Sequence, residues 1–455
     1  MPGFQTPSLE PGNLSPEVAR FGLGQLRPGE NVVLIGDNAA GKSRLVEQFL
    51  THCPYDKVQY IAFRDTYGVS DSSYYLQKRW NQIEIDPEFN PTVRESLSRI
   101  RCEEDYKQRL LTFFHLTPLL DAYLISLSSG ELRRFHLAKA LLRRPQILII
   151  DNPFIGLDAQ TRQMLSGLLD ELSQKGIQLV LVMSRLDVVP KCITGVIRLD
   201  TQAAPAPDRS TLGARVRAIP EKDLSQEAFY PKGTAPEIIR CNGVTIRYGQ
   251  RTILKDLNWV VREGERWVVS GANGSGKSTL LSCVCADNPQ SYACDIELFS
   301  HRRGGGETIW DIKKHIGYVS PEMHRAYQKN IPAQEVVASG LFDTVGLFQH
   351  ATPEQMAVCH EWMDIFGIRD LAESPFLKLS SGEQRLCLLA RAFVKDPELL
   401  ILDEPFHGLD EGRSLRAKII IEAFVRRAHK TLIMISHFRS EYPSCIDHEL
   451  ELQHH

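Results

Sequence analysis

Two short apolar runs stand out in the hydrophobic pattern of the chain, and each leads through a glycine-rich segment into a helix-forming stretch. Residues 32–35 and 267–270 are mostly apolar and bounded by turn-forming residues, as in buried strands. The stretches 44–50 and 279–285 that follow are predicted helices. The run from Ile147 to Ile150 predicts another buried strand, and no run reaches the roughly 18 apolar residues of a membrane-spanning helix. The pattern predicts an α/β fold, and any role at a membrane requires a partner subunit.

The same pattern occurs twice. Residues 36–43 recur as 271–278, and a Leu-Ser-Ser-Gly-Glu segment at 127–131 recurs at 379–383. Because 382 minus 130 and 403 minus 151 both give 252, the later motifs belong to one duplicated unit. The sequence therefore predicts a first domain over 1–200 and a second over 237–455. Residues 201–236 are rich in Ala, Pro and Ser without a sustained apolar period, and are predicted to be a linker.

Composition and charge narrow the class of protein. The chain has 455 residues, of which 43% are hydrophobic and 24% charged, as in globular proteins with more than one core. A formal net charge of −3 provides no bulk attraction to nucleic acid or anionic lipid. The start, Met1-Pro2-Gly3, has no basic and apolar signal pattern, and the ten cysteines lack C-x-x-C spacing. We expect buried thiols in a reducing cytoplasm rather than a metal site.

Both repeated glycine segments fit the phosphate-loop pattern G-x-x-x-x-G-K-S. In such loops the glycines let main-chain N–H groups approach phosphates, and the following helix N-terminus adds partial positive charge. Lys42 and Lys277 would reach the phosphates of ATP, while a hydroxyl and a strand-end carboxylate would hold Mg²⁺. The alternative for the carboxylates is an ordinary turn. The predicted nucleotide ligands are Gly36, Asn38, Gly41, Gly271, Asn273, Gly274, Gly276 and Thr279, and the predicted Mg²⁺ ligands are Ser43, Asp151, Ser278 and Asp403.

The Leu-Ser-Ser-Gly-Glu segments resemble the signature motif of ATP-binding cassette (ABC) ATPases, and the resemblance covers nearly the whole chain. It implies two tandem phosphate-loop nucleotide-binding domains, each with a mixed sheet core and a helical subdomain. In that family two cassettes close head to tail on ATP, so an intramolecular cassette pair is expected. The resemblance implies that Lys277 works with Ser128, Ser129 and Gly130, whereas Lys42 works with Ser380, Ser381 and Gly382.

The two predicted sites are not equal. Glu404 follows Asp403 at the position where similar cassettes place the general base, whereas Asn152 follows Asp151 and carries a neutral amide. Loss of such a base costs about 10² to 10⁴ in rate, so slow turnover is expected at the first site. The resemblance makes His437 a γ-phosphate contact. Counting back by 252 places Arg185 opposite it, as a phosphate clamp or as an ordinary surface arginine.

Two further positions distinguish this chain within the family. Tyr248 lies where related cassettes stack an aromatic ring on adenine, with an ordinary strand tyrosine as the alternative. The corresponding region of the first copy, near Asn13, has no aromatic residue, and Phe4 is a weak substitute. The loop that usually carries a glutamine for Mg²⁺ and the transmembrane partner reads Ser320-Pro321-Glu322 in the second copy and Arg64-Asp65 in the first. This departure weakens the case for conventional coupling, although Glu322 is a candidate substitute.

The stretch from Gly306 to Ser320 resembles the bacterial ModF type of tandem cassette, a group also named for photorepair and linked by name to molybdate uptake. Three functions stay open. The first is an ATPase subunit that drives a separate membrane permease, at the inner face of the plasma membrane. The second is a motor acting on ribosomes or DNA, and the third is an ATP-gated regulator. All three predict a cytoplasmic protein that binds ATP and Mg²⁺.

Overall fold

The computed structural model describes residues 29–36, 42–52, 57–62, 91–124, 127, 129–154, 157, 159–183, 189–199, 207–220, 235–248, 251–272, 274–327, 329–345, 349–436 and 438–453. The chain divides into two compact units, the first chiefly Met1–Ser70 and Asp86–Pro205, the second chiefly Ala206–His407 and Gly412–His455. Among the described residues, no helix combines the length and the apolar character needed to cross a membrane.

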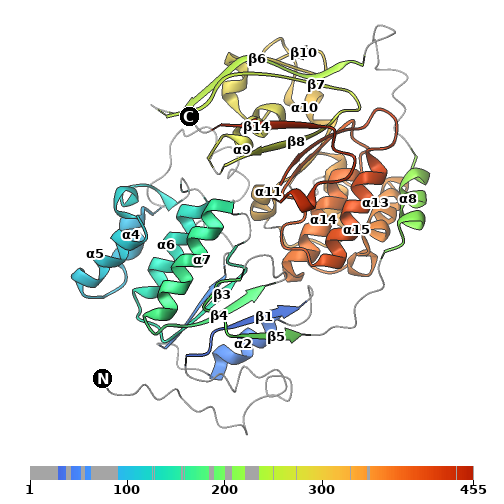
Figure 1. Ribbon diagram of the computed structural model, residues 1–455. Helices are drawn as coiled ribbons and strands as arrows, with labels where there is room; N and C mark the ends of the chain where they lie inside the picture. The colour runs from blue at the N-terminus through green and yellow to red at the C-terminus, as the bar shows by residue number, and fades with distance from the viewer. Residues whose placement is uncertain are drawn as a thin grey trace. The chain divides into compact units, whose positions relative to one another are not determined.

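The first unit is built on a five-stranded parallel sheet of order β2-β3-β4-β1-β5 (Figure 1). Its strands are β1 (Val32–Gly36), β2 (Val58–Ala62), β3 (Ile147–Asp151), β4 (Gln178–Met183) and β5 (Gly195–Leu199). Its helices are α2 (Lys42–His52), α4 (Val93–Ser98), α5 (Glu104–Phe113), α6 (Ser129–Leu141) and α7 (Ala159–Gln174). The strand predicted before residues 37–41 and the helix predicted after them are confirmed.

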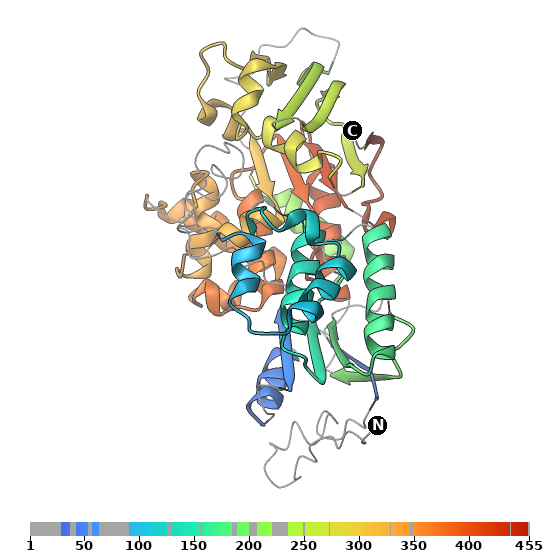
Figure 2. The ribbon, with the colours of Figure 1, turned by 90° about the vertical axis from the view of Figure 1, so that its left-hand side faces the viewer.

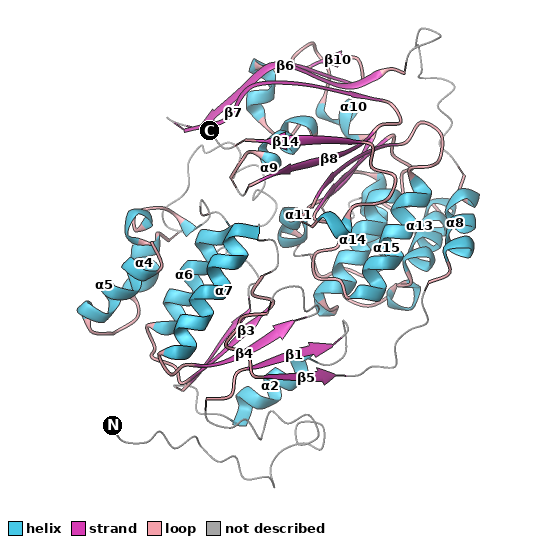
Figure 3. Ribbon diagram, in the orientation of Figure 1, coloured by secondary structure: helices cyan, strands magenta, loops and turns pink. Residues whose placement is uncertain are grey.

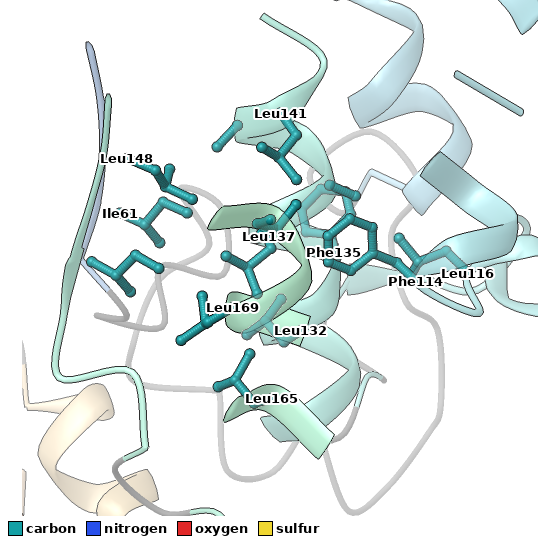
Figure 4. Close-up of a cluster of buried hydrophobic side chains, with 14 of the residues drawn as sticks. Ile61, Phe114, Leu116, Leu132, Phe135, Leu137, Leu141, Leu148, Leu165 and Leu169 are labelled. Atoms are coloured by element: carbon teal, nitrogen blue, oxygen red, sulfur yellow. The ribbon is translucent and has the colours of Figure 1, made fainter. Parts of the chain in front are cut away.

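Alternation along the strands buries both faces of this sheet. Val33, Leu148 and Leu181 belong to a core formed with α4, α5, α6 and α7, whereas Val32, Ile149 and Val180 pack with α2. Figure 4 shows the larger core, in which Leu137 of α6 lies beside Leu169 of α7 and Phe135 of α6 lies near Phe114. Burial on both faces explains why the strands read as continuous apolar runs in the sequence.

The second unit combines two sheets. A five-stranded parallel sheet has the order β11-β12-β13-β8-β14, and a four-stranded antiparallel sheet has the order β10-β9-β6-β7. Its strands are β6 (Glu237–Tyr248), β7 (Arg251–Arg262), β8 (Arg266–Gly271), β9 (Asp295–Leu298), β10 (His301–Arg302), β11 (Ile316–Val319), β12 (Leu399–Asp403), β13 (Thr431–Ile435) and β14 (His448–Leu452). The yellow-green β6 and β7 form a hairpin apart from the parallel strands (Figure 2).

The helices of the second unit are α9 (Lys277–Val284), α10 (Ile309–Lys313), α11 (Pro321–Ala326), α12 (Ala333–Ala338), α13 (Pro353–Phe366), α14 (Ser381–Phe393) and α15 (Glu411–Phe424). Helix α9 is buried in the same core as both sheets. Cys283 and Cys285 are packed in this core, as expected for buried thiols. Burial raises the pKa of both thiols, so they stay protonated. The second unit therefore has the parallel and antiparallel sheets and the helices expected of a cassette, and the described part of the first has the parallel sheet and its helices.

The two parallel sheets have the same strand order. Strands β1, β2, β3, β4 and β5 of the first unit take the places of β8, β11, β12, β13 and β14 in the second. Because strand order depends on many long-range contacts, this agreement supports the duplication inferred from motif spacing.

The segment predicted as a linker contains a helix. Helix α8 (Arg209–Ala218) begins at Asp208, whose side chain accepts from the N–H of Ser210. It buries Leu212 and Val216 and lies beside α13 (Figure 3). Its Arg215 pairs with Glu361 of α13 at 2.8 Å. The sequence did not predict this helix because its two apolar contacts are too few to make a periodic pattern.

The packing around α14 leaves no room for a side chain at Gly340. A Cβ there would lie 2.1 Å from the carbonyl oxygen of Arg391 and 2.9 Å from Val394 Cγ2. We therefore expect Gly340→Ala to destabilise the second unit by about 1–3 kcal/mol or more, since main chain must shift. The measurement is the thermal unfolding midpoint, which falls by about 2–4 °C for each kcal/mol.

Gly167→Ala, in α7, is the matched control, because a Cβ there meets nothing within 4 Å. Helix propensity predicts a small gain in stability, up to about 1 kcal/mol. Equal losses from the two substitutions would show that Gly340 is not sterically constrained.

Candidate functional site

The phosphate loop of the second unit turns on glycines in conformations that other residues rarely adopt. Gly271, Gly274 and Gly276 have φ angles of 138°, 84° and 96°. A Cβ on Gly271 would lie 2.5 Å from the carbonyl oxygen of Leu452, and one on Gly276 would lie 2.7 Å from Leu254 Cδ2. The loop therefore passes so close to β14 and β7 that only glycine fits at these two positions.

Lys277 opens α9 with its ammonium held against the loop. Its Nζ donates to the carbonyl oxygens of Gly271 at 2.7 Å and Ala272 at 2.8 Å, and the residue is 8% exposed. Ser275 is also buried, and its hydroxyl has no hydrogen-bond partner among the described residues. A buried hydroxyl without a partner is costly, and a phosphate oxygen would satisfy it. The loop thus has the shape and the donors of a phosphate site.

Asp403 lies at the same edge of the parallel sheet as the phosphate loop of the second unit. β12 ends at Asp403, β8 ends at Gly271, and β13 runs between them in the same direction. The carboxyl ends of parallel strands meet at one edge, where open α/β sheets bind ligands. Asp403 is 5% exposed, and Ser278 is half-buried in the first turn of α9.

A serine hydroxyl and an aspartate carboxylate are hard oxygen donors, as Mg²⁺ prefers. The described residues contain no cluster of three or more His, Cys, Asp or Glu suited to a metal. That donor set fits a phosphate-loop Mg²⁺, which is held by one or two protein oxygens together with phosphates and waters. When bound, Mg²⁺ would neutralise charge on the phosphates, with Ser278 and Asp403 as its holders.

Glu404 occupies a tight turn directly after β12. Its φ angle is 47°, and its N–H donates to the carbonyl oxygen of Ile435 at 2.9 Å. The carboxylate is largely buried, and its Oε2 lies 3.2 Å from His407 Nδ1. A left-handed conformation is uncommon for glutamate, so the surrounding contacts must enforce it. The turn fixes a carboxylate beside the strand that supplies Asp403.

Tyr248 ends β6, at the hairpin whose other strand contacts the phosphate loop. Its hydroxyl accepts from Asn288 Nδ2 at 3.0 Å, and its ring packs partly against the core around α9. Leu254 and Ile253 of β7 are the residues that crowd Gly276. Tyr248 is thus anchored on the element beside the loop, consistent with the predicted adenine contact, which stays a prediction.

The second signature segment forms the start of α14. Ser380 is the N-cap: its hydroxyl accepts from the N–H of Glu383, whose carboxylate in turn accepts from the Ser380 N–H at 2.9 Å. Ser381 is exposed in the first turn and Gly382 is buried. The segment therefore presents a helix N-terminus, with its main-chain donors, next to a serine hydroxyl.

In the first unit, the described residues Lys42, Asp151 and Asn152 are placed like Lys277, Asp403 and Glu404. Lys42 Nζ donates to the carbonyl oxygen of Gly36, as Lys277 does to Gly271. Asn152 has a φ of 50°, and its N–H donates to the carbonyl oxygen of Val182 at 2.8 Å. Its side-chain amide donates to Asp151 Oδ1 at 2.9 Å. The turn that carries Glu404 in the second unit is thus present, with an amide in place of the carboxylate.

Several predicted site residues lie outside the described residues. These are Asn38, Gly41, Ser128, Arg185, Asn273 and His437. For Gly130 only its place in α6 is described, and the side chains of Ser43, Ser129 and Glu322 are not described. Their roles remain predictions.

Strand register corrects one of the predicted correspondences. Thr431 pairs with Leu399, and Gln178 pairs with Ile147, so β13 and β4 are related by an offset of 253 rather than 252. The bonds from Glu404 to Ile435 and from Asn152 to Val182 give the same offset. Continued along the chain, that count equates His437 with Ser184 instead of Arg185. The single offset of 252 does not hold here, because the segment between β12 and β13 is one residue longer than the segment between β3 and β4.

In the loop after β11, the structure shows what Ser320 does. Ser320 is fully buried and caps α11, its hydroxyl accepting from the N–H of Met323 at 3.0 Å. Two residues that sequence reasoning missed also approach the turn after β12: His407, described above, and Arg385 of α14. Arg385 could have been found from the sequence, because Arg133 lies 252 residues before it at the equivalent position of the first copy.

A phosphate loop, a strand-end aspartate and a capped signature helix on one α/β unit, with the same sequence motifs earlier in the chain, define a tandem cassette ATPase. The family model for ABC transporters matches residues 24–155 and 254–407, and the chain belongs to this family of ATP-binding, ATP-hydrolysing proteins. The chain is 36% identical over 453 residues to the ABC transporter ATP-binding protein ModF of Escherichia coli (strain K12), covering 94% of this chain and 92% of that protein.

Other relatives agree with this assignment. An uncharacterized ABC transporter ATP-binding protein of Schizosaccharomyces pombe is 32% identical over 406 residues, covering 87% of this chain and 82% of the relative. Among solved structures, a model of ribosome-bound archaeal Pelota and ABCE1 matches with a TM-score of 0.54 and 18% identity, covering 93% of this chain and 72% of that one. At that identity the structural likeness concerns the fold alone.

Proposed function

We propose that the chain is the energising ATPase of a membrane transport system and hydrolyses MgATP mainly at the second cassette. The difference in activity between the two sites rests on a pair of matching turns. Glu404 and Asn152 have nearly the same φ angle and equivalent main-chain hydrogen bonds, yet only Glu404 can accept a proton. The first site would therefore hold nucleotide for longer than the second.

The likeness to ModF over almost the full length of both chains favours the transport role, since that relative is named as an ABC transporter ATP-binding protein. Such a subunit would work at the cytoplasmic face of the membrane with a separate permease. We extend the proposal to molybdate-type uptake on the family resemblance alone, because no described residue identifies a cargo.

One observation favours a second candidate, an ATPase that works on a soluble partner, a ribosome or DNA. No glutamine occurs between Ile316 and Tyr327, and the buried Ser320 is committed to capping α11. The loop that usually contacts the transmembrane partner thus lacks its usual side chain.

Co-purification of the full chain separates these candidates. In detergent extracts of cells fixed in the ATP-bound state by Glu404→Gln, a permease subunit is the expected partner. Recovery of ribosomes, nucleic acid or a soluble protein in its place, with no membrane protein, would refute the transport role.

The resemblance also assigns the signature around Ser128 to the nucleotide held by Lys277. We expect Ser128→Arg to lower steady-state ATP turnover more than Ser380→Arg, because a bulky cation at that N-terminus would block γ-phosphate binding at the faster site. Phosphate release measures both variants. Equal losses would argue against the crossed assignment.

A further inference from the structure

Arg385 is a buried cation that donates to four main-chain carbonyl oxygens. It lies in the second turn of α14 and is 1% exposed. Its guanidinium donates to the carbonyl oxygens of Asp403 at 2.7 Å, Glu404 at 2.5 Å and Pro405 at 3.4 Å. On the other side it donates to the carbonyl oxygen of Ser320 at 2.9 Å. One side chain thus spans the loops that follow β11 and β12.

This arrangement requires arginine. A buried charge is costly unless hydrogen bonds replace its hydration, and four carbonyl dipoles provide that replacement. The planar guanidinium offers five N–H donors in a rigid fork, whereas the ammonium of lysine is a compact charge at the end of a flexible stem. Lysine could keep the charge, but it could not hold both loops at once.

Arg385 holds the stretch of main chain that orients the side chain of Glu404. The N–H of Glu404 donates to Ile435 and its carbonyl accepts from Arg385, so the residue is fixed at both ends in an uncommon conformation. Catalytic groups must be placed to within about an ångström, and a misplacement of that size costs roughly 10²-fold in rate. A change at Arg385 therefore acts on the direction of the carboxylate.

The helix that carries Arg385 begins at the signature segment. Gln384, the preceding residue, accepts through its Oε1 from His324 Nε2 of α11 at 2.9 Å. The first turns of α14 are thus tied to the loop after β11 and to the turn after β12. In the first unit Arg133 is likewise buried and donates to the carbonyl oxygen of Pro153, the counterpart of Pro405.

We propose that Arg385 is a positioning residue for ATP hydrolysis: it holds the turn after β12 so that Glu404 faces the attacking water, and it links that turn to the signature helix. The inference rests on the proposed function, since it takes Glu404 as the base of the second site. Arg385 itself touches neither nucleotide nor water in this role.

The test is Arg385→Lys in the full-length chain, assayed for steady-state MgATP hydrolysis. We expect kcat to fall at least tenfold and KM for ATP to change less than threefold, because the phosphate loop is untouched. Arg385→Lys combined with Glu404→Gln should hydrolyse ATP no more slowly than Glu404→Gln alone, since the two changes remove the same contribution. A further loss in the double variant would overturn the assignment.

Arg391→Lys is the matched control. Arg391 lies on the same helix, is 5% exposed and donates to Ser339 Oγ and the carbonyl oxygen of Thr344, both at 3.0 Å. It should lower the thermal midpoint about as much as Arg385→Lys while leaving kcat within twofold of the parent. A loss in Arg385→Lys that disappears when the assay is run well below its unfolding midpoint would make Arg385 purely structural.

A second variant, Arg385→Gln, keeps two N–H donors without the charge. If Arg385→Lys does not fold, Arg385→Gln is tested instead. We expect its kcat to fall while its KM for ATP is retained. A kcat equal to that of the parent protein would overturn the proposal. Failure of the proposed function looks different: Glu404→Gln would then keep most of the activity. If Glu404→Gln is inactive and Arg385→Lys is not impaired, only the positioning role fails.

Discussion

Glu404→Gln is expected to lower steady-state ATP hydrolysis by about 10² to 10⁴, the usual cost of losing a general base. The substitution keeps the size of the side chain and removes its ability to accept a proton. Glu404 lies in a turn fixed by Ile435 and Arg385, so the glutamine should occupy the same place. Phosphate release measures the loss, and equilibrium binding of ATP should be unchanged or tighter.

Asn152→Ala is the matched substitution in the first unit. Asn152 occupies the equivalent turn, but its amide donates to Asp151 and cannot act as a base. Its loss should reduce turnover far less than that of Glu404. Comparable reductions from Glu404→Gln and Asn152→Ala would contradict the proposed inequality of the sites.

The elements around the phosphate loops could be predicted because their signals are local. The apolar runs before Gly36 and Gly271 became β1 and β8, and Lys42 and Lys277 begin the helices that follow. Motif spacing established the duplication, which the matching strand orders support. These features depend on residues within a few positions of each other or on exact repetition.

Features that depend on long-range contacts were missed. Helix α8 is stabilised by packing on α13 and by the Arg215 to Glu361 pair, which lie 146 residues apart and leave no local pattern. The one-residue shift that separates Arg185 from the position of His437 appears only when the ladder between β3 and β4 is compared with the ladder between β12 and β13. Arg385 has a repeat partner in Arg133, yet its four carbonyl contacts come from loops that only folding brings together.

Lys277→Met should lower kcat/KM for ATP by about 10² to 10⁴. The buried stem of Lys277 would be replaced by one of similar length, so the loop should keep its shape while the charge is lost. Hydrogen bonds from a charged donor contribute about 1.5–3 kcal/mol each, and two such bonds to phosphate account for the range. The measurement is steady-state hydrolysis together with ATP binding at equilibrium.

Lys42→Met makes the equivalent change in the first unit, where the ammonium donates to Gly36 as Lys277 does to Gly271. It should weaken nucleotide binding at that site and reduce turnover by a smaller factor, because the base follows Asp403 and not Asp151. If Lys42→Met stopped hydrolysis as completely as Lys277→Met, occupancy of the first site would be obligatory for each turnover. The first site would then control the catalytic cycle even though it lacks a base, and the two cassettes could not work as a fast and a slow site independently.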